Sequence, residues 1–216
     1  MTYPRRVSES HVTEPLLTPR FARAVTFAGA VHANQVRKGT DIPYLAHLMA
    51  VAALVLEAGG DEDCAIAAIL HDAVEDSVDG KAMTGRIRKR FGERVSAIVA
   101  GCSDAVAVPG LPKSDWRPRK EAYLRRLKVE GDIGVLLVSA CDKLHNVRAI
   151  VSDLAKSGQV VWSRFTVGKE SQLWYYGSLS EVYKIRAKNF AGGEQLAPIA
   201  NELAKVVAEM QSLANS

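Results

Sequence analysis

The chain of 216 residues has a formal net charge of +4, and 48% of its residues are hydrophobic while 24% are charged. These proportions are close to those of globular proteins and support a sizeable core. No apolar run reaches the ~18 residues that a membrane-spanning helix needs, and no apolar signal segment follows the N-terminal residues 3–6. The sequence therefore predicts a cytoplasmic protein without a membrane partner.

The small positive charge favours an anionic partner without requiring nucleic acid. The basic run "GRIRKRFGER" at residues 85–94 also presents Ile87, Phe91 and Val95 at helical spacing, so its arginines are interpreted as a solvated helix face. No basic motif interleaved with aromatic residues is found, and we expect no nucleic-acid partner. The three cysteines have no paired spacing, and each is expected to be a buried, reduced thiol.

The elements expected along the chain are helices. Residues 1–17 lack periodicity and are expected to form a mobile tail, and loops with Pro, Gly and Trp are expected at 104–116 and 157–168. Periodicity and end signals predict helices at 18–32, 43–58, 61–76, 82–90, 92–103, 117–129, 132–156, 169–189 and 195–213. No repeat or heptad pattern is present, so the predicted fold class is a compact all-α bundle of many helices.

One predicted helix ends in an unusual group of polar residues. The stretch "AIAAILHDAVED" at 65–76 places His71 four residues before Glu75, and Asp72 four residues before Asp76. On a helix these residues form two adjacent rows on one face. Buried, unpaired carboxylates would be very costly, so the rows face water, a cation or a metal ion. A helix end that meets solvent explains the acids, but it explains the His-Asp pair poorly.

Two further polar residues stand in similar apolar surroundings. His47 lies early in the helix predicted at 43–58, and Asp142 ends the apolar run "VLLVSAC". Together with His71 and Asp72 they offer two nitrogen and two oxygen ligands. This mixed set suits an octahedral ion such as Mn²⁺, although Fe²⁺, Zn²⁺ and Co²⁺ cannot be separated by ligand type.

The motifs "RKGTDIPYLAH", "LHDAVED" and "CDKLHN", in this order, resemble the hydrolase domain of RelA/SpoT homologues, which are HD-domain metal-dependent phosphohydrolases. The resemblance covers roughly residues 20 to 190. It implies an HD-type hydrolase domain at 18–190, with residues 191–216 as a C-terminal helix that packs on the domain or on a partner subunit. A homo-oligomer therefore stays open. The synthetase domain of these proteins is absent, so the chain resembles a stand-alone small alarmone hydrolase.

The resemblance also implies roles for individual residues. His47, His71, Asp72 and Asp142 match the Mn²⁺ ligands, and Glu75 and Asp76 match the catalytic acids, of which either could be the base. For the nucleotide, the resemblance implies that Arg37 contacts the base, Lys38 lies near phosphate and Asn146 contacts the ribose. Lys113, Lys169 and Trp174 are weaker substrate-binding candidates, and Trp174 is equally explained as a core aromatic.

The function implied is metal-dependent hydrolysis of the 3′-pyrophosphate of guanosine tetra- or pentaphosphate, which gives pyrophosphate and GDP or GTP. A first alternative keeps the metal site but takes an adenine alarmone or NADPH as the substrate. A second alternative is a nucleotide-binding protein without activity. The complete set of candidate ligands and catalytic acids argues against the second alternative.

Overall fold

The computed structural model describes residues 16–104, 109–110 and 115–216, so nearly all of the expected tail and Lys113 lie outside the described residues. Within these ranges the chain forms α-helices, one 3₁₀ helix and a single isolated β-bridge, and the all-α prediction is confirmed. The helices are α1 (Pro19–Val31), α2 (Leu45–Glu57), α3 (Glu62–Leu70), α4 (Gly80–Phe91), α5 (Glu93–Cys102), α6 (Trp116–Val129), α7 (Ile133–Ser157), η1 (Gly158–Arg164), α8 (Gly168–Asn189) and α9 (Gly193–Asn215).

Two of the predicted elements were wrong in extent. The helix predicted over 61–76 ends at Leu70, and residues 71–75 form turns. The side chain of His71 explains this end: its Nδ1 donates to the carbonyl of Ala68, 2.8 Å away. That carbonyl is the acceptor that the N–H of Asp72 would need for another helical turn. The loop predicted at 157–168 contains the 3₁₀ helix η1, which buries Trp162.

The predicted helix end at Gly59 and Gly60 is confirmed in detail. Gly59 has φ +82°, and its N–H donates to the carbonyl of Leu56 at 3.0 Å. The N–H of Gly60 donates to the carbonyl of Val55 at 2.9 Å, which completes a Schellman motif. A Cβ on Gly60 would lie 2.5 Å from Val55 Cγ1, so the chain requires glycine here. This sharp end lets α3 fold back onto α2.

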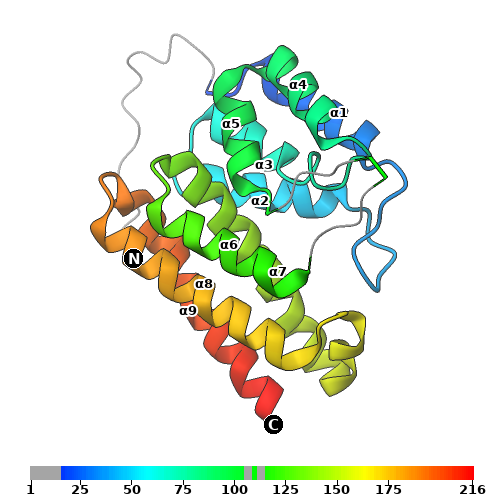
Figure 1. Ribbon diagram of the computed structural model, residues 1–216, viewed down its shortest axis with the longest axis vertical. Coiled ribbons are helices and arrows are strands. Elements are labelled where there is room, and N and C mark those ends of the chain that lie inside the picture. The colour runs from blue at the N-terminus through cyan, green and yellow to red at the C-terminus, as the bar shows by residue number, and fades with distance from the viewer. Residues whose placement is uncertain (1–15, 105–108, 111–114) are drawn as a thin grey trace, which may run out of the picture.

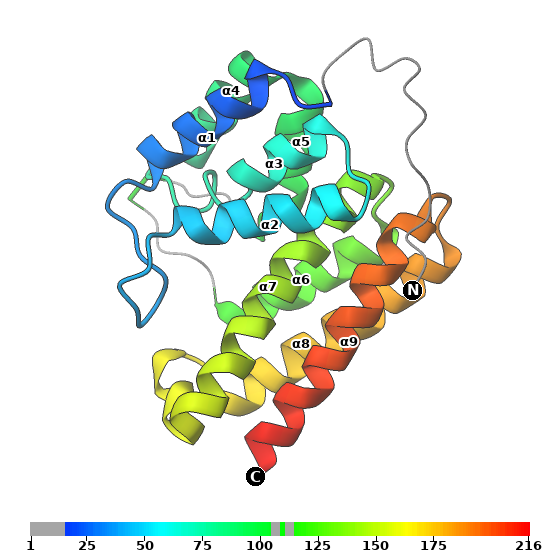
Figure 2. The same cartoon turned by 180° about the vertical axis from the view of Figure 1, so that it is seen from behind.

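Helix α7 connects the two parts of the molecule (Figure 1). It packs against α2, α3 and α5 on one side and against α8 and α9 on the other. Figure 2 shows α2 lying across the upper part of α7 while α8 and α9 run beside its lower part. Residues 134–142 of α7 are all buried, so any polar side chain among them must find partners inside the protein.

Helix α9 packs on its own chain. Its residues Leu196, Leu203 and Met210 are seven apart, which places them on one face, and all three are fully buried against α7 and α8. The sequence left the choice between the domain and a partner subunit open, and the described contacts are with the same chain. The boundary between the hydrolase domain and the C-terminal helix at residue 190 stays a prediction.

All three cysteines are buried and free, as expected. Burial raises the pKa of the Cys64 thiol to about 12, so it remains protonated and unreactive at neutral pH. Among the described residues, none of the helices is both long and apolar enough to cross a bilayer.

We predict that Leu203→Ala destabilises the fold by about 2–5 kcal/mol, because the truncation leaves a cavity between α9 and its neighbours. Urea unfolding followed by circular dichroism measures this change. Val129→Ala is the control: Val129 is 80% exposed and should stay within about 0.5 kcal/mol of the parent chain. Equal stabilities for the two variants would show that α9 does not belong to the cooperative core.

Candidate metal centre

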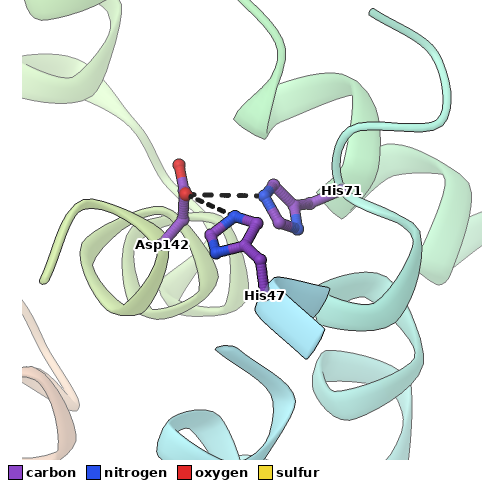
Figure 3. A group of neighbouring side chains, drawn as sticks. All are labelled: His47, His71 and Asp142. Carbon is purple, nitrogen blue, oxygen red and sulfur yellow. Dashed lines mark ion pairs between the residues drawn. The ribbon is translucent and has the colours of Figure 1, made fainter. Parts of the chain in front are cut away.

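Three buried side chains from three helical segments converge on one point (Figure 3). His47 lies in the first turn of α2, His71 follows the last residue of α3, and Asp142 lies in the middle of α7. Asp142 Oδ1 is 3.2 Å from His47 Nε2 and 3.5 Å from His71 Nε2. One donor atom from each residue lies within 4.8 Å of the others, so a single ion can contact all three.

Both imidazoles are held by their Nδ1 atoms. His71 Nδ1 donates to the Ala68 carbonyl, and His47 Nδ1 lies 2.8 Å from His145 Nδ1. Burial, with the neighbouring His47, lowers the pKa of His145 to about 4, so His145 is neutral at neutral pH and shares one hydrogen bond with His47. These contacts hold both rings with their Nε2 atoms directed toward the centre of the cluster.

Asp72 lies beside this group and completes the predicted set of four. Its Oδ2 is 3.0 Å from His71 Nε2 and 3.8 Å from His47 Nε2, and it accepts a hydrogen bond from the Tyr44 hydroxyl. Burial would raise the pKa of Asp72, but the neighbouring His71 outweighs it and lowers that pKa. The carboxylate is therefore ionised at neutral pH.

The second carboxylate is also kept ionised inside the protein. Burial would raise the pKa of Asp142, but Lys143 and His71 hold it well below its usual range. Asp142 Oδ2 accepts from Lys143, and Oδ1 accepts from Asn146 Nδ2 at 2.6 Å. Burial would lower the pKa of His71, but Asp72 and Asp142 raise it well above its ordinary value. The two carboxylates thus favour a proton on His71, and a divalent cation bound at the same place would displace that proton.

These residues fit a divalent metal ion. The Nε2 atoms of His47 and His71 are buried, and neither has a well-aligned hydrogen-bond partner among the described residues. Buried polar atoms without such partners are costly, and metal coordination satisfies them. Two nitrogen and two carboxylate donors are a set that first-row divalent ions accept.

The two predicted catalytic acids lie in the segment after α3, not on a continuous helix, so the expected stacking over His71 and Asp72 was wrong. The N–H of Asp76 still donates to the Asp72 carbonyl at 2.9 Å, so one isolated turn joins them. Exposed Asp76 accepts from Gln35 Nε2 at 2.8 Å, and half-buried Glu75 lies 3.9 Å from Arg119. Each acid is therefore held by a different neighbour.

A hollow of about 390 Å³ adjoins the cluster on the side of α7, and Arg37, Lys38 and Asn146 all line it. The Val36–Pro43 bridge closes the loop that carries Arg37, and Arg37 Nη2 donates to Asn146 Oδ1 at 3.2 Å. Since Asn146 also donates to Asp142, one hydrogen-bonded chain links the hollow to the histidine-aspartate cluster. A larger hollow of about 940 Å³ lies between α1 and α4 and reaches Asp76. None of the four candidate ligands lines either hollow, but Tyr44 and Asn146 of the smaller one hydrogen-bond to Asp72 and Asp142, so we place the site there.

The sequence matches the family model described as "HD domain" over residues 24–169. The chain belongs to the HD-domain family. It is 38% identical over 133 residues to a probable guanosine-3′,5′-bis(diphosphate) 3′-pyrophosphohydrolase of Synechocystis, a match that covers 59% of this chain and 16% of that protein. It is 31% identical over 138 residues to the bifunctional (p)ppGpp synthase/hydrolase SpoT of Escherichia coli, covering 62% and 18%. The chain thus aligns with less than a fifth of each relative.

Solved structures share the HD-domain fold. One belongs to a metazoan orthologue of SpoT that hydrolyses ppGpp; it has a TM-score of 0.64 and 24% identity, and the match covers 90% of this chain and 97% of that one. Another, from Listeria monocytogenes, has a TM-score of 0.63 and 26% identity, covering 79% and 99%. These likenesses support the fold over nearly the whole length of both solved chains.

Two predicted substrate residues of this HD domain lie away from the smaller hollow. Lys169 Nζ donates to the carbonyl of Ala214 at 2.9 Å, where it caps the end of α9. The ring of Trp174 packs on Trp116, and the Arg117 guanidinium lies 3.3 Å from its centre. Neither residue lines the hollow of Arg37. Their roles in binding stay predictions, as does that of Lys113.

Tyr44 and His145 were not among the site residues predicted from the sequence. Tyr44 precedes His47 by three residues, a spacing that could have suggested a shared face. His145 follows Asp142 by three residues, yet its contact with His47 joins two helices and has no local signal. Arg119 also contacts the site only through tertiary packing.

We predict that His71→Ala and Asp142→Asn abolish retention of Mn²⁺ after dialysis, because each removes a donor from the centre. His145→Ala should weaken the affinity about 10- to 100-fold, since it removes the group that orients His47. Metal analysis by plasma mass spectrometry and Mn²⁺ titration measure both effects. His32→Ala is the control, because His32 is buried and bonds Gln35 outside the cluster. Equal Mn²⁺ content in His71→Ala and His32→Ala would exclude this metal centre.

Proposed function

We propose that this HD domain hydrolyses the 3′-pyrophosphate of guanosine tetra- and pentaphosphate with Mn²⁺, giving pyrophosphate and GDP or GTP. The observation that carries the proposal is the continuity of the site. The chain from Arg37 through Asn146 to Asp142 joins a nucleoside-sized hollow to a metal-ligand cluster. The names of the relatives in Synechocystis and Escherichia coli support the same chemistry.

In this proposal His47, His71, Asp72 and Asp142 hold the metal ion. A divalent ion bound by these residues supplies a Lewis acid for a phosphoryl oxygen and lowers the pKa of water near it. Mn²⁺ is our choice because it accepts mixed imidazole and carboxylate donors with water in the remaining positions. The carboxylates, kept ionised by Lys143 and His71, are ready to bind the ion at neutral pH.

Glu75 and Asp76 supply the proton transfers. The oxygen of water forms a bond to the phosphorus attached to the 3′-oxygen, and the bond between that phosphorus and the 3′-oxygen breaks. One carboxylate takes the proton released by the water, and the ribose 3′-oxygen takes up a proton to become a hydroxyl. Gln35 fixes Asp76 and Arg119 lies beside Glu75, so the two acids have different surroundings and can take different roles.

The nucleoside occupies the hollow lined by Arg37, Lys38 and Asn146. Asn146 holds the planar guanidinium of Arg37 at its wall, where it can stack on a purine. Lys38 lies over the ring of Phe165, 5.8 Å from its centre, on the same rim. Its ammonium group is available for the 5′-phosphates of the substrate.

The decisive measurement is product analysis by chromatography with Mn²⁺ and a panel of guanine alarmones, adenine alarmones and NADPH. We expect pyrophosphate and GDP from guanosine tetraphosphate, with turnover reduced to background in Asp72→Ala. A chain that leaves the guanine compounds intact but cleaves another substrate would reject our choice of base. Full activity of Asp72→Ala, with its metal content checked, would reject the mechanism.

We further predict that Arg37→Met raises KM for guanosine tetraphosphate about tenfold, with a smaller change in kcat, because the guanidinium binds the nucleoside away from the reacting bond. Arg37→Lys should recover little of this loss, since an ammonium group stacks poorly on a purine. Steady-state kinetics give both parameters. Arg148→Met, which changes a cation of α7 that pairs with Glu202 and does not line the hollow, is the control and should leave KM unchanged. A fall in kcat alone would contradict the binding role of Arg37.

A further inference from the structure

A second cluster of buried charged side chains lies beside Glu75. Asp104, two residues after the end of α5, accepts from Arg119 and Lys120 of α6. The Arg119 Nη1 to Asp104 Oδ1 distance is 2.5 Å. The side chains of Asp104 and Arg119 are 4% and 11% exposed, so this ion pair is largely shielded from water.

The same guanidinium nitrogen reaches Glu75. Arg119 Nη1 lies 3.9 Å from Glu75 Oε1, so it stands between the carboxylates of Asp104 and Glu75. Glu75 lies in the turns after α3, where no continuous helix fixes its direction. A fixed cation beside such a side chain restricts the positions that its carboxylate takes up.

Asp104 in turn is a rigid anchor for Arg119. Burial would raise the pKa of Asp104, but Lys120 and Arg119 outweigh it and lower that pKa, so the anchor stays anionic. Lys120 is a second cation in contact with this carboxylate, so Arg119 is not the only group that neutralises Asp104. The group of Asp104, Arg119 and Lys120 therefore carries one net formal positive charge beside Glu75.

We infer that Arg119, anchored by Asp104, is a positioning residue that holds the Glu75 carboxylate beside the metal centre for proton transfer. The inference rests on the proposed function and adds a residue to it. Arg119 contributes through Glu75 and not by binding the nucleotide, whose hollow lies on the side of Arg37 and Asn146. Its loss should therefore lower kcat and leave substrate affinity nearly unchanged.

The test is steady-state hydrolysis of guanosine tetraphosphate by the Mn²⁺-loaded chain and its Arg119 variants. Arg119→Ala should lower kcat about 10- to 100-fold, as displacement of a catalytic group by about 1 Å does, while KM changes less than about threefold. Mn²⁺ content should equal that of the parent chain. Added guanidinium ion should restore part of kcat in Arg119→Ala, and Arg119→Lys should retain more activity than Arg119→Ala.

The anchor is tested by a double-mutant cycle. Asp104→Asn should lose much of the same kcat, and Asp104→Asn combined with Arg119→Ala should be little worse than Arg119→Ala alone, because the two residues act as one unit. Arg126→Met is the matched control. Arg126 lies on the same helix and donates to the carbonyls of Gly101 and Ser103, so it ties α6 to the same segment without contacting Glu75 in any described interaction.

Several results would overturn the inference. These are an unchanged kcat in Arg119→Ala, a rise in KM at constant kcat, or an equal loss of kcat in Arg126→Met, which would mean a merely structural tie. If Arg119→Ala does not fold by circular dichroism, Arg119→Lys and Asp104→Asn carry the same comparison. If the parent chain is active and Arg119→Ala has the same kcat, only this inference is rejected. A parent chain inactive on every nucleotide of the panel rejects the proposed function and this inference together.

Discussion

The buried carboxylate of Asp142 is the group around which the rest of the site is arranged. A charge in the middle of a core helix is very costly unless hydrogen-bonded and oppositely charged neighbours compensate it. Lys143 and Asn146 come from its own helix, whereas His47 and His71 come from α2 and the end of α3. The packing of α2 and α3 against α7 and the electrostatics of the centre therefore depend on each other.

The early end of α3 gives the site its shape. Because His71 takes the Ala68 carbonyl, the chain leaves the helix at the point where the polar residues begin. Asp72 can then approach both histidines, while Glu75 and Asp76 separate toward different neighbours. A continuous helix would have kept these acids in two parallel rows. The break instead provides one ligand and two acids in unlike surroundings, an arrangement that suits separate roles in proton transfer.

Two sets of neighbours contact the proposed site residues. Asn146 joins the centre to the Arg37 hollow through two hydrogen bonds, which favours nucleoside binding there. The buried pair of Arg119 and Asp104 lies beside Glu75. Such a buried ion pair is weak evidence for stability, because desolvation offsets its attraction. Its location next to a proposed catalytic acid makes a positioning role the better explanation.

The sequence by itself determined the all-α class, most helix limits and the motifs that identify the HD domain, because these depend on local periodicity, capping residues and short spacings. It predicted four candidate ligands, and the structure brings His47, His71 and Asp142 to one point with Asp72 beside His71. Only the tertiary structure decided where α3 ends and which neighbours hold the site. The contacts of His145 with His47, and of Arg119 with Glu75, join segments 98 and 44 residues apart, and no local pattern encodes such pairs.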